Sequence, residues 1–317
     1  MFVGVDIGGS TIDAVAVDEA GRIANSTSVP TRADDGDGVL LSAIAAVRAT
    51  CNGVEDLTGI GVGVPGLVNV STGSVRLAMN INIGAEGFPI GPKIEAEFGL
   101  PTTVENDVRA AALGAYERFA TDGDIRTLAF IGIGTGISAG VVIDGRLHRG
   151  RDGLAGEIGH VPVVPDGPEC RCGLTGCLEA VAAGPAIARL WPAARTAAEE
   201  LFLAAASGDP EAVRAAAVVA GHLATAVHLV SSAYDPDLIV LGGGVGSLGD
   251  PLISAVKSCL AGAAERSPLA RHIVLPERLV SVPRGIAIGA VGAAAVARRR
   301  FGGDRGDEHP AAGGRMP

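Results

Sequence analysis

The residues best suited to chemistry lie in one short stretch of the chain. A histidine is followed by three cysteines that fall within eight residues, namely His160, Cys170, Cys172 and Cys177. One imidazole and three thiolates are the ligand set of a tetrahedral zinc site, whereas this spacing suits a disulfide framework poorly. With four protein ligands no position stays open for water, so the pattern predicts a structural zinc ion. Reduced cysteines in a surface loop are the alternative.

Two carboxylates, Glu157 and Glu179, flank this stretch. Zinc bound at one ring nitrogen of His160 fixes the ring and leaves its other nitrogen free to bind a carboxylate or a ligand. Glu157 and Glu179 can accept hydrogen bonds from the hydroxyls of a sugar. The alternative for both is an ordinary solvated carboxylate.

A second candidate site begins at Asp6, which ends a short apolar run that starts at Phe2. Glycines let backbone N–H groups approach a phosphate closely, hydroxyls can donate to its oxygens, and a carboxylate can hold waters on Mg²⁺. A β-hairpin turn that merely needs glycine is an equally good interpretation of this motif alone. The residues after the acid are two glycines and two hydroxyl residues: Gly8, Gly9, Ser10 and Thr11.

Two further glycine turns follow apolar runs, at 132–136 and 241–245. The first contains Gly134 and Thr135, and the second contains Gly243 and Gly244. Each turn alone favours a purely structural role, although a triple glycine permits a flat adenine or ribose to lie against the backbone. Three such turns, each after an expected buried strand, together indicate a phosphate- and nucleotide-binding protein.

Glu105, Asn106 and Asp107 lie between an expected strand and an expected helix. A carboxylate at this place can accept the proton of an attacking hydroxyl, as phosphoryl transfer requires. Asn and Asp also favour the N-cap of a helix, so capping is the alternative, and one residue can cap while the other works.

Hydrophobic periodicity and turn residues predict an α/β protein of two domains with an active-site cleft between them. We expect a small N-terminal domain at 1–118, completed by a C-terminal helix at about 286–300, and a large domain at 119–285 with the zinc loop at 160–177. A tail at 302–317 is expected to be disordered. The expected strands are 2–6, 14–17, 23–29, 60–64, 102–104, 128–133, 137–143, 238–241 and one near Leu279, and the expected helices are 38–48, 94–98, 107–118, 185–206, 210–233, 252–264 and 285–300.

Composition narrows the class of partner. The 317 residues carry a net charge of −10, which argues against nucleic acid because phosphate binding needs a basic surface. We identify no apolar run suited to spanning a bilayer and no charged region followed by an apolar signal segment at the start. The sequence therefore predicts a soluble cytoplasmic protein without a membrane partner.

Taken together, these motifs resemble the ROK family (repressor, open reading frame, kinase) of the actin-like ATPase superfamily. The resemblance runs from about Val3 to Ala297 and also includes Gly63-Val64-Pro65-Gly66 and the run Gly153 to His160. It implies two actin-like (ribonuclease H-like) α/β domains, ATP and Mg²⁺ as cofactors beside a structural Zn²⁺, and a homodimer or homotetramer.

The resemblance also implies roles for single residues. Asp107 would be the catalytic base and Asp6 the acid that faces Mg²⁺ and phosphate, with the turn from Gly8 to Thr11 around the transferring phosphate. Gly134 and Thr135 would bind neighbouring phosphates, and Gly243 and Gly244 the adenosine. The residues implied to hold the sugar ring are Gly66, Asn80, Asn106, Asp107, Glu157, His160 and Glu179.

The chain departs from the family pattern at two places. Thr11 stands where the family commonly has lysine, which removes a cation near the phosphates. Arg109 follows Val108 where many members have asparagine, and it either alters the surroundings of the base or lies on the far face of its helix.

The resemblance implies an ATP-dependent sugar kinase that acts on a hexose hydroxyl, with glucose as the first choice. Kinases of amino or N-acetylated hexoses (N-acetylglucosamine, N-acetylmannosamine, kanosamine) are the alternative, and fructose and allose stay open. A sugar-responsive ROK regulator is the leading non-enzyme alternative. Because Asp6 lies almost at the N-terminus, we expect no DNA-binding segment before it. An actin-like ATPase with a non-sugar substrate is a further alternative.

Overall fold

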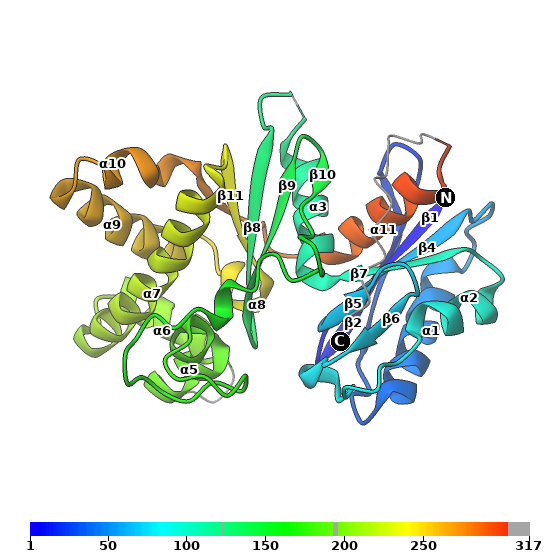
Figure 1. Cartoon of the computed structure of the whole chain (residues 1–317), viewed down its shortest axis with the longest axis horizontal. Helices are drawn as coiled ribbons and strands as arrows, with labels where there is room; N and C mark the ends of the chain where they lie inside the picture. Colours follow the sequence, from blue (N-terminus) through cyan, green and yellow to red (C-terminus); the bar gives the residue numbers. More distant parts are fainter. Residues whose placement is uncertain (122, 193–195, 304–317) are drawn as a thin grey trace. The chain divides into compact units, whose positions relative to one another are not determined.

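The computed structural model describes residues 1–121, 123–192 and 196–303, and the tail prediction falls almost entirely outside them (Figure 1). The described chain forms two compact units. Unit 1 comprises Met1–Thr121, Gly145–Ala155 and the described part from Ala287 onward, and unit 2 comprises the described parts of Asp122–Asp144 and Gly156–Ile286. The segment 145–155, which the sequence placed in the second domain, therefore belongs to unit 1.

Unit 1 is a five-stranded sheet of order β3-β2-β1-β4-β7, with helices on both of its faces (Figure 1). The pairs β1–β2 and β2–β3 are antiparallel, whereas β1–β4 and β4–β7 are parallel. The elements of unit 1 are β1 (Phe2–Ile7), β2 (Thr11–Val17), β3 (Ile23–Pro30), α1 (Gly36–Cys51), β4 (Gly59–Val64), β5 (Leu67–Asn69), β6 (Ser74–Arg76), the 3-10 turn η1 (Met79–Ile81), α2 (Ile90–Phe98), β7 (Thr102–Asn106), α3 (Asp107–Phe119), β10 (Arg146–Leu147) and α11 (Ile288–Phe301).

Alternation along β1 explains how this sheet is covered. Val3 and Val5 join the core beneath α1, whereas Phe2 packs with Ala290 and Ala294 of α11 on the opposite face. Side chains of successive strand residues point to opposite faces, so Gly4 and Asp6 share the α11 face with Phe2.

Helix α11 approaches the sheet so closely that only glycine fits beneath it. A Cβ at Gly4 would lie 1.9 Å from the carbonyl oxygen of Ala290, and one at Gly61 would lie 1.8 Å from that of Ala293. The crossing of α11 with α3 is equally tight, because a Cβ at Gly292 would lie 1.7 Å from the carbonyl oxygen of Ala110. The last helix thus packs on strands formed by the first 64 residues of the chain.

Unit 2 contains strands in the order β9-β8-β11-β12. Strand β9 is antiparallel to β8, and β11 is parallel to both β8 and β12, which repeats the pattern of β2-β1-β4-β7 in unit 1. The mixed α/β fold class predicted from the sequence is confirmed. The elements of unit 2 are β8 (Thr127–Ile133), β9 (Ile137–Ile143), η2 (Ile158–His160), α4 (Leu178–Ala182), α5 (Gly184–Leu190), α6 (Ala197–Ala206), α7 (Pro210–Tyr234), β11 (Leu238–Gly242), α8 (Gly243–Gly246), α9 (Asp250–Arg266), α10 (Ala270–Ile273), η3 (Pro276–Arg278) and β12 (Leu279–Ser281).

One expectation about the helices of unit 2 is wrong. The single helix expected over 185–206 is two helices, since α5 ends at Leu190, and Pro192 lies just beyond it. Proline lacks the N–H that would continue the ladder of helix hydrogen bonds. Helix α7 is long and apolar enough to cross a membrane by length and composition. Alanines and valines of α7 bury one face of the helix in the core of unit 2.

Candidate active site

The turn from β7 into α3 separates the two roles proposed for its polar residues. Asn106 is the N-cap of α3, and its side-chain oxygen accepts from the N–H groups of Val108 at 3.1 Å and Arg109 at 3.2 Å. Asp107, the first residue of the helix, is therefore not needed as the cap and lies partly buried at the carboxyl end of β7. The capping role that the sequence offered as an alternative for this turn therefore belongs to Asn106.

Gly66 lies beside this turn. The end of β4 pairs with the end of β7, with Val64 opposite Asn106, and the Asn106 side chain donates to the carbonyl oxygen of Gly66 at 3.4 Å. Gly66 has φ of +93°, and a Cβ there would lie 2.8 Å from the carbonyl oxygen of Arg76. Its backbone conformation and its neighbours both require glycine.

Asp6 lies close to Asp107 because glycine separates them. A Cβ on Gly63 would lie 3.5 Å from Oδ1 of Asp6 and 3.6 Å from the Cα atom of Asp107. Burial raises the pKa of Asp6 well above its usual range, and the negative charges of Asp107 and Asp13 raise it further. A partly buried carboxylate beside a second acid suits a divalent cation, and Asp6 would hold Mg²⁺ through the ion's own waters.

The raised pKa of Asp6 predicts a stability cost. A carboxyl group whose pKa is higher in the folded protein contributes stability below its unfolded pKa and loses it as pH rises through the folded pKa. At neutral pH the metal-free protein is therefore less stable than in acid on account of Asp6. We expect Asp6→Asn to raise the Tm by a few degrees in thermal melts at neutral pH with Mg²⁺ chelated, and to leave the Tm unchanged in acid. A lower Tm at neutral pH would contradict this prediction.

The predicted phosphate turn is the β1–β2 hairpin turn. The Gly8 N–H donates to the carbonyl oxygen of Thr11 at 2.9 Å, and the Gly8 carbonyl accepts from the Thr31 hydroxyl at 2.7 Å. Gly9, Ser10 and Thr11 are exposed. The motif therefore forms the hairpin turn that the sequence offered as one interpretation. The exposed Gly9, Ser10 and Thr11 of this turn are also accessible to a phosphate. Asn80 is also exposed, and its backbone lies next to Gly9.

The turn at 134–136 joins β8 to β9 in unit 2. The Gly134 N–H donates to the carbonyl oxygen of Gly136 at 2.9 Å, and Thr135 is exposed at the tip. Glu179 sits against this turn, because its Oε2 accepts from the Ile137 N–H at 3.1 Å. The sequence assigned Glu179 to the sugar, and the structure also places it on the back of the proposed phosphate turn.

The second glycine turn of unit 2 follows β11. Gly243 has φ of +78°, and a Cβ there would lie 2.5 Å from the carbonyl oxygen of Ile133 at the end of β8. A Cβ on Gly244 would meet nothing within 4 Å among the described residues. Gly243 is thus required by packing, whereas Gly244 leaves open backbone against which an adenosine can lie.

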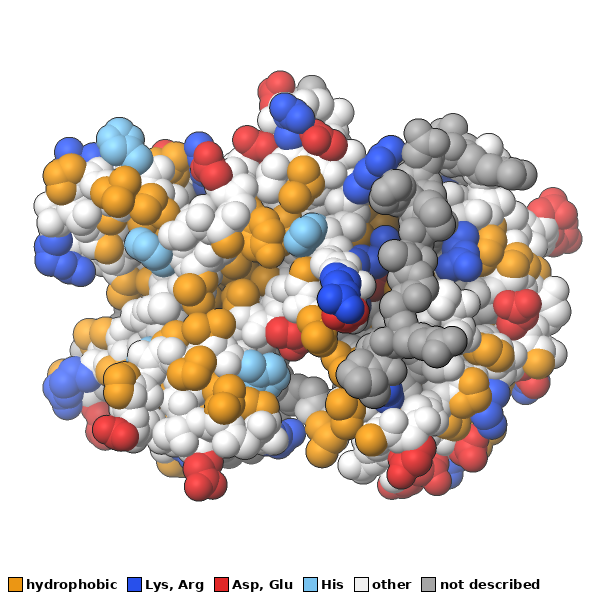
Figure 2. Space-filling view, in the orientation of Figure 1, with side chains coloured by type: hydrophobic (Ala, Val, Ile, Leu, Met, Phe, Trp, Pro, Cys, Tyr) orange, Lys and Arg blue, Asp and Glu red, His pale blue; other side chains and the backbone are white. Residues whose placement is uncertain are grey.

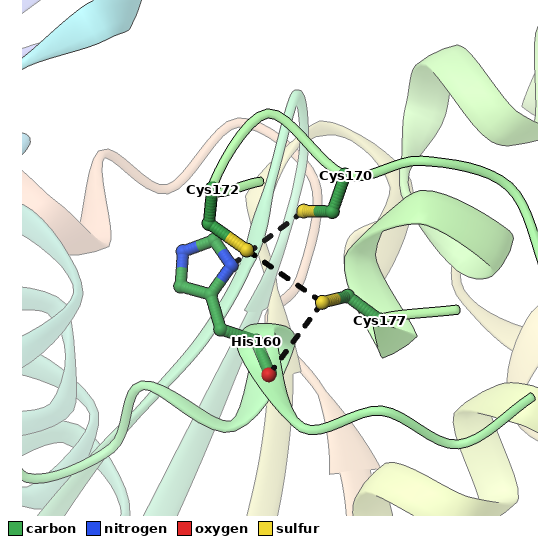
Figure 3. A group of neighbouring side chains, drawn as sticks. All are labelled: His160, Cys170, Cys172 and Cys177. Atoms are coloured by element: carbon green, nitrogen blue, oxygen red, sulfur yellow. Dashed lines mark hydrogen bonds between the residues drawn. The ribbon is translucent and has the colours of Figure 1, made fainter. Parts of the chain in front are cut away.

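The predicted metal ligands of unit 2 converge (Figure 3). The ligand atoms of His160, Cys170, Cys172 and Cys177 all lie within 4.8 Å of one another. The Cys172 and Cys177 sulfurs are 3.7 Å apart, as are the Cys170 sulfur and Nδ1 of His160. With Zn–S bonds of about 2.3 Å, two thiolates of a tetrahedral site lie about 3.8 Å apart. The residues therefore fit a zinc ion.

Local backbone structure positions this cluster. Cys170 and Cys172 share a tight turn closed by the Cys170 N–H donating to the Leu174 carbonyl oxygen at 2.8 Å, and Cys177 caps α4. Burial, with the neighbouring Cys172 and Cys170 thiols, raises the pKa of Cys177 to about 12 when no metal is bound. Nε2 of His160 lies 3.9 Å from Oε2 of Glu157, so the nitrogen that faces away from the thiols has the carboxylate partner that the sequence suggested.

The sequence missed a buried group next to Asp107. Arg109 is 2% exposed and Glu105 only 1%, and Nε of Arg109 donates to Oε1 of Glu105 at 2.8 Å. Arg149 donates to the other oxygen of Glu105 at 2.6 Å. Burial raises the pKa of Glu105, but the charges of Arg149 and Arg109 outweigh it and leave the pKa below its usual value.

Arg109 lies two residues after Asp107 and is buried against Glu105 at the end of β7. Glu105 lies in β7 and Arg109 in α3, so the pair crosses the junction between strand and helix and no helical spacing rule marks it in the sequence. On the face drawn in Figure 2, acidic and basic side chains are interspersed.

A hollow of about 570 Å³ between α7 and α9 of unit 2 contains none of the predicted site residues.

The model of the ROK family matches residues 2–300, so this chain belongs to the ROK family. It is 37% identical over 279 residues to a glucokinase of Halalkalibacterium halodurans, covering 81% of this chain and 84% of the relative. It is 36% identical over 265 residues to an N-acetylmannosamine kinase of Citrobacter koseri, covering 81% and 87%.

Among solved structures the chain resembles a ROK family glucokinase from Streptomyces griseus in complex with glucose and AMPPNP. The TM-score is 0.78 at 32% identity, covering 94% of this chain and 99% of that one. The predicted family and the predicted actin-like α/β fold are confirmed.

Proposed function

We propose that the chain is an ATP-dependent hexokinase that transfers the γ-phosphoryl group of Mg-ATP to the 6-hydroxyl of glucose. The predicted enzyme class, a sugar phosphotransferase, is confirmed by the kinase relatives at 36–37% identity. The observation that supports the mechanism is the β7–α3 turn, where Asn106 caps the helix and the Cα atom of Asp107 lies across Gly63 from the carboxylate of Asp6.

In this mechanism Asp107 takes the proton of the 6-hydroxyl as its oxygen bonds to the γ-phosphorus. The bond from that phosphorus to the β,γ-bridging oxygen breaks, and ADP leaves with the electron pair. Asp6 would hold Mg²⁺ through the ion's waters, and the bound ion would neutralise charge on the phosphates. The backbone N–H groups of the turns at Gly8–Thr11 and Gly134–Thr135 bind phosphate oxygens, and Gly243 and Gly244 lie against the adenosine.

The sugar residues are proposed from the family resemblance. The hydroxyls of the sugar would be bound by Gly66, Asn80 and Asn106 of unit 1 and by Glu157, His160 and Glu179 of unit 2. Zinc held by His160, Cys170, Cys172 and Cys177 would fix the His160 ring and thereby the neighbouring Glu157. We further propose a cytoplasmic enzyme that assembles as a homodimer or homotetramer, which size-exclusion chromatography with light scattering tests.

The choice of sugar is tested by ADP release from Mg-ATP across a panel of hexoses, N-acetylhexosamines and free amino sugars. We expect the highest kcat/KM with glucose, because glucokinases are among the relatives and glucose occupies the Streptomyces griseus structure. A preference for N-acetylmannosamine would favour the second group of relatives. Sugar binding without ADP release from any acceptor would instead favour a sugar-responsive regulator.

A further inference from the structure

Glu105, Arg109 and Arg149, together called the arginine cluster, join two segments of unit 1 that are distant in sequence. Oε1 of Glu105 accepts from Nε of Arg109 at 2.8 Å and from the Asn106 N–H at 2.9 Å, and Oε2 accepts from Nε of Arg149 at 2.6 Å. Nη1 of Arg109 donates to the carbonyl oxygen of Gly153 at 2.7 Å. One guanidinium of this cluster thus bonds the β7–α3 turn and the segment 149–155 at the same time.

The segment 149–155 is a closed loop. The Ala155 N–H donates to the carbonyl oxygen of Arg149 at 3.2 Å, and Gly150 and Gly153 adopt positive φ of 71° and 73°. The loop is held at both ends of its curve, by the side chain of Arg149 and by the carbonyl of Gly153. All of these contacts lie within unit 1, so the cluster fixes the loop 149–155 against the end of β7.

The arginine cluster is not explained by its contribution to stability alone. Arg109 and Glu105 are 2% and 1% exposed, while Arg149 is 37% exposed. Buried ion pairs are often no more stabilising than apolar residues of the same volume, because desolvation offsets the attraction. They do fix geometry, since a bidentate guanidinium has defined donor directions. The location of the cluster one residue from Asn106 and two from Asp107 makes that geometry relevant to the reaction.

We infer that Glu105, Arg109 and Arg149 are positioning residues that hold the Asn106–Asp107 turn against the loop 149–155 within unit 1. The inference rests on the proposed kinase activity. None of the three residues needs to touch a substrate. A base displaced by about 1 Å can lose a hundredfold in rate, and water then takes a larger share of the phosphoryl groups.

Arg149→Met is the principal test, because Arg149 is partly exposed and its loss leaves Glu105 paired with Arg109. We expect kcat for sugar phosphorylation to fall about tenfold, within the range that misplacement explains, while KM for ATP stays unchanged. We also expect the ratio of sugar phosphate formed to ADP formed to drop below that of the wild type. This ratio does not depend on the fraction of folded enzyme, so a merely structural role would not change it.

Arg109→Lys is the second variant, since it keeps the charge but cannot donate to Glu105 and Gly153 together as the guanidinium does. We expect a loss at least as large as in Arg149→Met. Arg126→Met, which removes an exposed pair with Asp144, is the matched control and should behave as the wild type.

An unchanged product ratio and a kcat within twofold in Arg149→Met would overturn the inference. Wild-type kinetics in Arg109→Lys would also overturn it. The same holds if the loss of kcat in Arg149→Met is matched by an equal loss of sugar-binding sites, measured by calorimetry. A wild-type protein that phosphorylates no sugar would overturn the proposed function itself. An active wild type with unaffected variants would overturn the inference alone.

Discussion

Asp107→Asn should lower kcat by about 10²–10⁴-fold, the range that a general base contributes, while KM for the sugar changes only a few-fold. Asparagine keeps the size of the side chain and the oxygen that accepts from the Val108 N–H at 2.9 Å, so the first turn of α3 is preserved. It cannot accept the proton of the acceptor hydroxyl at neutral pH. Steady-state kinetics with glucose and calorimetric measurement of sugar binding would separate the two effects.

A matched control for this variant is Asp37→Asn. Asp37 is also an acid in the first turn of a helix of unit 1, and it pairs with Lys93 at 3.1 Å on the surface. Its kinetics should match the wild type. Sugar affinity falling as far as kcat in Asp107→Asn would show that Asp107 shapes the pocket rather than accepting a proton.

Removal of one ligand of the proposed zinc site should have the second large effect. Cys177 is fully buried at the start of α4, and its sulfur lies 3.7 Å from that of Cys172. Cys177→Ser should abolish stoichiometric zinc, measured by elemental analysis. It should also destabilise the protein by about 4–5 kcal/mol, as expected for loss of a structural metal, measured by denaturant unfolding. Activity should fall with it, because His160 and Glu157 share the affected loop.

Cys259→Ser provides the control, since Cys259 is a thiol of unit 2 that lies outside the cluster. It should keep its zinc and its stability. Full stability and activity in a zinc-free Cys177→Ser protein would show that the four residues need no metal to hold this loop.

Local patterns predicted the features that depend on neighbours in sequence. The convergence of His160 with its three cysteines was readable because ligand chemistry fixes the spacing. The roles of Asn106 and Asp107 were narrowed to capping and catalysis because strand ends and helix starts have recognisable residues. Apolar runs located most of the strands for the same reason.

Other features depend on contacts that spacing does not contain. Glu105 and Arg149 are 44 positions apart, and only the folded sheet brings their side chains together. The packing of Glu179 against the turn at Gly136 likewise depends on tertiary structure. The sequence indicated no run suited to a bilayer, whereas α7 passes that test by length and composition, because an alanine-rich core helix and a membrane helix have similar composition.

The packing of α11 has a consequence for synthesis on the ribosome. Gly4 and Gly61 lie within van der Waals reach of Ala290 and Ala293, which are translated more than 200 residues later. At a translation rate of about 5–20 residues per second, roughly 10–50 s pass between synthesis of the first sheet and synthesis of the helix that covers it. During that interval one apolar face of the nascent unit 1 stays uncovered, so unit 1 completes its folding only after α11 has been synthesised, and a chaperone that binds apolar surface would act before that point.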